Sequence, residues 1–136
     1  MTENNLPDNR ETYFVPHGSI VRNIWGKSDT ILVLFAGAAA EFALNKAVDW
    51  LYYTGKLPND PIGRLFSTVA YARNIVFATE TKALKTIDDI VHIHAHVEQA
   101  RGAVIPMEAY RDVLYMLIHY SIAAFECMER PMKYKE

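Results

Sequence analysis

A stretch of 23 residues without proline or glycine, Thr79–Arg101, most constrains the fold of this chain. It is rich in Ala, Lys, Glu and Asp, Thr79 is a candidate N-cap, Glu80 lies in the expected first turn, and Gly102 follows as a candidate C-terminal glycine. Three of the five histidines occupy alternate positions within it. A strand would place all three on one face, but the length and composition predict a helix.

The helical interpretation separates the three histidines. At about 100° per residue, His94 shares a face with apolar residues, namely Leu84, Ile87, Ile90, Val91 and Val97. His92 and His96 share the opposite face with polar residues, namely Lys85, Asp88, Asp89 and Gln99. We therefore expect His94 to point into the protein and the other two to point toward water.

Size and charge narrow the class of protein. With 136 residues, 51% of them hydrophobic and 22% charged, the chain fits one domain with an ordinary core. The net charge of −2, without a basic run, argues against a nucleic-acid binder. We expect a flexible lead-in over residues 1–16, a single helical domain over 17–130 and a tail over 131–136. No secretory signal is seen at the start, so a cytoplasmic location is the default expectation.

Helix signals elsewhere complete an all-α prediction. We expect three further main helices, which run from Ser28 or Asp29 to about Tyr53, from Pro61 with Asp60 as N-cap to about Phe77, and from Met107 to about Glu129. On the last of these, Val113, Leu114, Leu117 and Ile118 form the expected inner stripe. The longest apolar run, 31–40, is too short for a transmembrane segment. The fold class is therefore a helical bundle of about four main helices.

Several polar or small residues have more than one interpretation. Cys127, the only cysteine, is expected to be a small packing residue. The run Ala36–Ala40 would admit a closely packed helix or a flat ligand. His92 and His96 have the spacing of a two-histidine zinc site, which Asp88 or Asp89 would complete, although solvated surface histidines are commoner. His17 fits a turn, and His119 fits a packed core position.

Three segments, taken in order, resemble a known family. They are Gly18-Ser-Ile-Val-Arg-Asn-Ile-Trp-Gly26, Asp60-Pro-Ile-Gly-Arg-Leu-Phe-Ser-Thr68 and Val91-His-Ile-His-Ala-His-Val97. The sequence is similar to the bacterial latex-clearing rubber oxygenases and to a fungal oxygenase of mycophenolic acid biosynthesis. The resemblance covers roughly 18–126. Ser67 stands where the rubber oxygenases have a lysine, and this chain looks like the front half of a longer domain.

The resemblance implies a cofactor and roles for three residues. Members hold heme b in a helical domain through one histidine, so His94 is the implied proximal ligand of the heme iron. Arg64 and Thr68 are the implied oxygen-side or pocket residues, with catalytic and cofactor-binding roles. Glu98, one turn beyond His94, is placed to accept a hydrogen bond from its second ring nitrogen. The implied activity is that of an oxidoreductase acting with dioxygen on a small, apolar, unsaturated substrate.

A different class of function fits the same residues. A heme-free, shortened relative would act as a helical interaction or dimerisation module, because an incomplete domain leaves apolar surface that a second copy can cover. From the residues alone, a hydrogen-bonded core histidine is a commoner explanation of His94 than a metal ligand. The surroundings of His94 and the exposed apolar faces distinguish the heme oxygenase from the homodimeric module.

Overall fold

The computed structural model of the chain describes residues 12–46 and 61–136, apart from the side chains of Pro61, Ile62 and Arg64. Its helices are α1 (Ile20–Trp25), α2 (Ser28–Leu44), α4 (Pro61–Val76), α5 (Glu80–Arg101) and α6 (Met107–Met128). Within the described residues there is one isolated β-bridge and no strand, so the protein is all-α as predicted. None of these described helices is long and apolar enough to cross a membrane.

Helix α5 begins and ends where its sequence predicts. Thr79 is the N-cap in extended conformation, and Gly102 adopts a left-handed φ of 63° at the C-terminus. The amide of Gly102 donates to Gln99 O and that of Ala103 to Glu98 O, at 3.4 and 3.2 Å. This pair of bonds is a Schellman motif, which satisfies the last carbonyls of the helix and turns the chain toward α6.

Two features of the first half differ from the sequence prediction. Helix α2 ends at Leu44 rather than near Tyr53, because Asn45 is extended and its side-chain amide donates to Asp112 Oδ2 of α6 at 3.2 Å. Residues 47–53 of the predicted helix lie outside the described residues. So does Asp60, the predicted N-cap of the next helix. The short helix α1 was not predicted, although Ser19 caps it by accepting from Val21 N.

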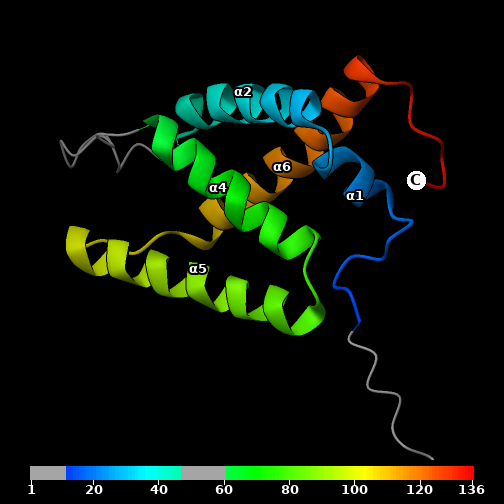
Figure 1. Cartoon of the computed structure of the whole chain (residues 1–136). Coiled ribbons are helices and arrows are strands. Elements are labelled where there is room, and N and C mark those ends of the chain that lie inside the picture. Colours follow the sequence, from blue (N-terminus) through cyan, green and yellow to red (C-terminus); the bar gives the residue numbers. More distant parts are fainter. Residues whose placement is uncertain (1–11, 47–60) are drawn as a thin grey trace, which may run out of the picture.

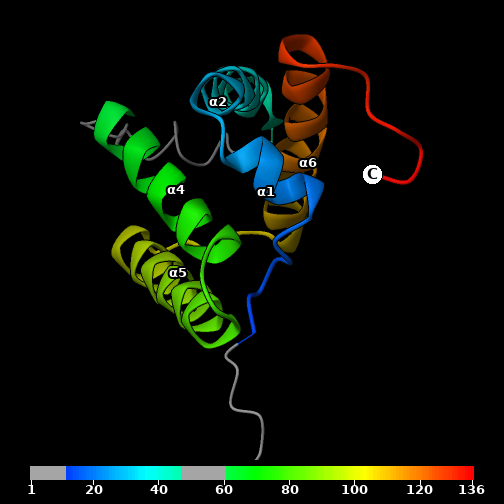
Figure 2. The same cartoon turned by 45° about the vertical axis from the view of Figure 1, so that its right-hand side comes forward.

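The helices form two pairs joined by α1. Helix α2 packs along α6, helix α4 packs along α5, and α1 contacts both α2 and α4. Figure 1 shows α1 at the right-hand ends of α2 and α4, and Figure 2 shows it between α4 on the left and α6 on the right. The core gathers around α1 from residues of both pairs, namely Ile24, Trp25, Ile31, Leu34, Phe35, Val76, Ala124 and Phe125. Burial of this cluster supplies the main apolar driving force that holds the pairs together.

The N-terminal segment is tied to the corner between α4 and α5. Phe14 N donates to Ala78 O at 3.2 Å, and Glu80 N donates to Thr12 O at 2.8 Å. The predicted boundary between residues 16 and 17 stays a prediction, but these bonds join residues on its N-terminal side to the helical domain.

Helices α2 and α6 are in tight contact at Gly37. A Cβ atom added to Gly37 would collide with the ring of Tyr120, so the ring lies directly on the glycine backbone. The Tyr120 hydroxyl donates to Glu41, one turn later on α2, and this bond raises the pKa of Tyr120. The close-packing interpretation of the small-residue run is thus confirmed at Gly37, whereas Ala36, Ala39 and Ala40 are exposed.

The face that α6 turns toward α2 is not the predicted one. Val113, Leu114 and Ile118 are exposed, and only Leu117 of the predicted inner stripe is partly buried against the core. The buried positions are instead Ala109, Met116, Ala124 and Phe125. The Tyr120 ring, on the same side of α6 as Ala109, Met116 and Ala124, fits against α2 because Gly37 has no side chain at the point of contact.

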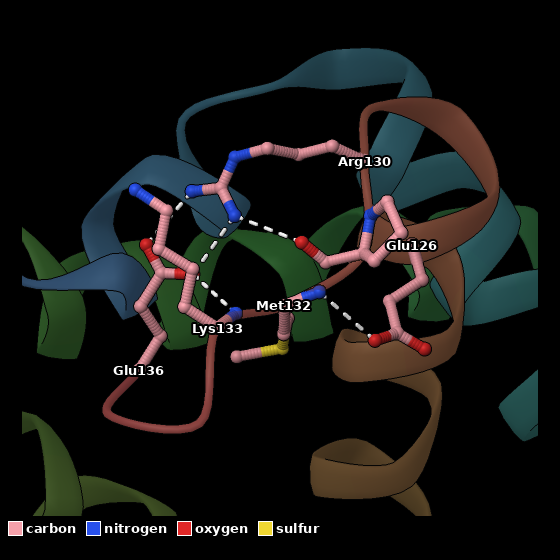
Figure 3. A network of polar contacts seen from close by, with 6 residues as sticks. Glu126, Arg130, Met132, Lys133 and Glu136 are labelled. Carbon is pink, nitrogen blue, oxygen red and sulfur yellow. Dashed lines mark hydrogen bonds and ion pairs between the residues drawn. The ribbon is translucent and has the colours of Figure 1, made fainter.

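The C-terminal tail folds back beside α1 through a polar network (Figure 3). Arg130 Nη1 and Nη2 donate to the two carboxylate oxygens of Glu136, each at 2.8 Å, and Lys133 N donates to Glu136 Oε2 at 2.8 Å. Met132 N donates to Glu126 Oε1 at 3.0 Å, and the Met132 side chain packs against the core. A two-pronged arginine–carboxylate pair thus closes the tail into a loop.

We predict that Gly37→Ala destabilises the protein by about 1–3 kcal/mol, because the new methyl group must displace the Tyr120 ring. In an open helix the same change would instead stabilise by about 1 kcal/mol. Urea unfolding measures the difference. Gly18→Ala is the control, since a Cβ there meets no atom within 4 Å. An increase in stability for Gly37→Ala would contradict the close contact.

A second prediction concerns Thr30, which is fully buried and whose hydroxyl has no hydrogen-bond partner among the described residues. Thr30→Val keeps the shape and removes the unpaired hydroxyl, so we expect stabilisation by about 1 kcal/mol. Thr30→Ser keeps the hydroxyl and removes the methyl group, so we expect a loss of about 1 kcal/mol. Thermal unfolding of both variants provides the measurement. Destabilisation by valine would reveal a hydrogen bond at this position.

A third prediction concerns pH and the tail. The hydrogen bonds from Arg130 and from Lys133 N lower the pKa of Glu136 from 4.5 to about 2. Because the pKa of Glu136 is lower in the folded state, the ionised carboxylate stabilises the folded tail at pH values above 4.5. This stabilisation is lost as the pH falls toward 2. We expect the amide resonance of Lys133 to stay constant through pH 4.5 and to shift only near pH 2. Glu136→Gln should abolish this low-pH shift and Glu126→Gln should preserve it, whereas a midpoint at the ordinary pKa would contradict the ion pair.

Candidate functional site

The three histidines of α5 point as the sequence predicts. His94 is partly buried, together with Ile87, Ile90 and Val97 on the same side of the helix. His92 and His96 are exposed. His92 Nδ1 donates to the carbonyl of Asp88 in its own helix at 2.7 Å, which ties this ring to the surface of α5.

Tyr110 of α6 contacts His94 edge to face. The ring centroids are 5.3 Å apart and the ring planes meet at 72°. Neither ring nitrogen of His94 makes a hydrogen bond to another described residue. Among the described residues the imidazole is therefore positioned by packing against an aromatic ring, and in the neutral ring the nitrogen without a proton is the one that can bind a metal or accept a hydrogen bond.

Glu98 has a different role from the predicted one. Its Oε1 accepts a hydrogen bond from Ile105 N at 2.7 Å, so it closes the connection between α5 and α6 and does not orient His94. Burial and the nearby charge of Glu98 both raise the pKa of Tyr110. The sequence did not predict the role of Tyr110, because its contact with His94 depends on how the connection between α5 and α6 folds. The only sequence signal for that connection was Gly102, which ends α5 in a Schellman motif.

The other two predicted site residues lie on α4, which packs along α5. Thr68 is exposed and takes part in a further interaction. The side chain of Arg64 lies outside the described residues, and its position on the α4 backbone is one helical turn before Thr68. The structure thus brings the helix that carries Arg64 and Thr68 against the helix that carries His94, while their roles stay predictions.

The remaining candidates separate clearly by exposure. Cys127 is exposed, so its expected role as a packed residue is wrong. His119, expected in the core, is also exposed and meets the Tyr120 ring edge-on, with centroids 5.0 Å apart. His17 is exposed in a turn and contacts Tyr13, as the simpler interpretation predicts. The zinc hypothesis lacks support, because the described part of the chain has no group of three or more metal-binding side chains.

A shallow polar pocket lies between α1 and the C-terminal tail. Its lining residues are Gly18, Ser19, Ile20, Asn23, Arg130, Lys135 and Glu136. The guanidinium of Arg130 is already bound by Glu136, and the Ser19 hydroxyl caps α1. Three of the polar side chains of the pocket are thus engaged in internal contacts, and His94 remains the better candidate for chemistry.

Comparison with known proteins gives one match. The model of the family described as ER-bound oxygenase mpaB/B'/Rubber oxygenase, catalytic domain, matches residues 25–135. This range includes His94, Tyr110 and both predicted residues of α4. No curated protein and no solved structure matches the chain.

Proposed function

We propose that this chain is a heme b-dependent oxygenase. The premise is that it belongs to the family of the ER-bound oxygenase mpaB/B' and rubber oxygenase catalytic domain. In this proposal His94 is the proximal ligand of the heme iron, and the substrate is a small, apolar, unsaturated molecule that reacts with dioxygen. The observation that carries the proposal is the orientation of His94, which alone among the histidines of α5 is partly buried.

The surroundings of His94 fit an imidazole that binds heme. A heme-ligating histidine needs an uncharged ring with an available nitrogen, next to apolar surface that accommodates the porphyrin. His94 has ring nitrogens without hydrogen bonds to other described residues, and it lies on a helix side with Ile90 and Val97. Tyr110 restricts rotation of the ring by its edge-to-face contact. These features support ligation through His94.

Arg64 and Thr68 are proposed to act from α4. An arginine can pair with a carboxylate of the cofactor or with a bound anion, and a threonine hydroxyl can donate a hydrogen bond. The packing of α4 along α5 supports a shared site. When bound, heme iron supplies the binding and activation of dioxygen. The protein would then orient the oxygen, exclude water and hold the substrate against apolar side chains.

Exposed apolar side chains on α5 support an apolar substrate. Leu84, Val91 and Ile93 are all exposed large hydrophobic residues, and Leu84 and Val91 lie on the predicted His94 face. A hydrocarbon or a terpene-like chain would cover such surface with a favourable loss of hydration. Charged substrates would gain little from it.

The test of the proposal is visible absorption of the purified protein before and after hemin addition and desalting. We expect a Soret band in the wild type and its loss or clear shift in His94→Ala. His92→Ala and His96→Ala are matched controls on the same helix, and both should keep the wild-type spectrum because their side chains are exposed. Absence of a stable band in the wild type, or equal spectra for all four proteins, would refute heme ligation by His94.

Arg64→Ala and Thr68→Val extend the same experiment to α4. Both variants should retain the Soret band, because neither supplies the proximal ligand, and should lower oxygen consumption with an unsaturated substrate by about 10–1,000-fold. Oxygen uptake at equal heme content is the measurement. Unchanged uptake in both variants would remove α4 from the proposed site.

One observation favours a second candidate function, a heme-free helical interaction module. Helix α6 carries exposed apolar residues on the side away from α2, including Leu114, Ile118 and Ile122. Such a surface is typical of a protein that associates with another helix. A colourless protein that associates through α6 would support this candidate over the oxygenase.

A further inference from the structure

Helix α6 has two apolar faces, and one of them is exposed from Leu114 to Ile122, although Phe125, beyond the end of this stretch, is buried in the core. The face toward α2 holds Tyr120, Ala109, Met116 and Ala124. The opposite face carries four large hydrophobic side chains with high exposed fractions, namely Leu114 at 55%, Tyr115 at 61%, Ile118 at 48% and Ile122 at 39%. We call these four residues the outer stripe.

The outer stripe has the spacing of a helix–helix contact surface. Leu114, Ile118 and Ile122 follow one another at intervals of four residues, so they form one row along the helix, and Tyr115 flanks it. Scattered single hydrophobic residues are normal on a surface, but a continuous row over more than two turns points to a partner.

The charges at the two ends of the row are opposite. Arg111 lies one turn before Leu114, and Glu126 lies one turn after Ile122. Both are exposed, and they stand roughly 22 Å apart along the helix axis at 1.5 Å per residue. One carboxylate oxygen of Glu126 accepts from Met132 N, which leaves the second oxygen for another contact.

This order of residues is complementary to itself in the antiparallel direction. We propose that the outer stripe binds the outer stripe of a second copy of this chain, with α6 antiparallel to α6 across a two-fold axis near Ile118. Leu114 then meets the partner subunit's Ile122, and Arg111 meets the partner subunit's Glu126. Each contact occurs twice, as two-fold symmetry requires.

The charges also disfavour the parallel arrangement. Parallel helices would place Arg111 against the partner subunit's Arg111 and Glu126 against the partner subunit's Glu126, so both ends would repel. Only the antiparallel pairing joins the apolar centres and the opposite charges at once. The inference concerns the surface of α6 and does not depend on heme or on the proposed activity.

Charge reversal tests the pairing directly. Sedimentation velocity over a range of concentrations should show a monomer–dimer equilibrium for the wild type. Arg111→Glu and Glu126→Arg should each weaken dimerisation by about tenfold or more, because two like-charge contacts replace two attractive ones. The double variant R111E/E126R should recover association, because the opposite charges are restored with exchanged positions.

The outcomes separate the alternatives. A wild type that stays monomeric at millimolar concentration, or a double variant no better than the two single variants, would overturn the proposal. Circular dichroism and thermal unfolding of each variant check that the fold is intact, which exposed positions should permit.

Cysteine cross-linking tests the position of the axis. In a Cys127→Ser background, Ile118→Cys should form a disulfide with its own copy under mild oxidation, because residues at a two-fold axis approach themselves. Leu32→Cys, at an exposed apolar position on α2, is the control and should not cross-link. Cross-linking at Leu32→Cys without cross-linking at Ile118→Cys would place the interface elsewhere and refute the proposal.

Discussion

The close contact between α2 and α6 at Gly37 determines how the second half of the molecule is oriented. Because the Tyr120 ring lies on the glycine backbone, α6 must turn the side with Ala109, Met116 and Ala124 toward α2. Ten residues earlier on α6, Tyr110 then faces His94 of α5, and the outer stripe of α6 faces away from α2. A single missing side chain therefore influences both the candidate heme site and the candidate interface.

A second constraint acts at the turn between α5 and α6. The left-handed Gly102 ends α5, and Glu98 accepts a hydrogen bond from Ile105 N on the far side of the turn. Glu98 lies one helical turn after His94, so the same residue that anchors the turn also fixes the helix segment that carries the histidine. Among the described residues, His94 makes an edge-to-face contact with Tyr110 and no hydrogen bond, so packing orients its ring there.

The sequence predicted what local patterns determine and failed where tertiary contacts decide. The bounds of α5 and the inward position of His94 followed from capping residues and helical periodicity. The end of α2 at Leu44 could not be predicted, because it depends on a bond between Asn45 and Asp112 of a distant helix. Glu98 was assigned to His94 by spacing alone, whereas the fold of the turn gives its carboxylate to Ile105. Arg64 and Thr68 remain predictions from family resemblance.

The sequence prediction assigned the wrong side of α6 to the core, and this error reveals that α6 has two apolar sides. Periodicity identified an apolar row through Leu114 and Ile118, and such rows normally face the core. The structure shows that Ala109, Met116, Tyr120 and Ala124 occupy that place, with the Tyr120 ring against Gly37 of α2. A helix that is apolar on two opposite sides is typical of a helix buried on both sides. The described fold covers one side, so the chemistry of the outer stripe is most simply explained by a partner that completes the burial of α6.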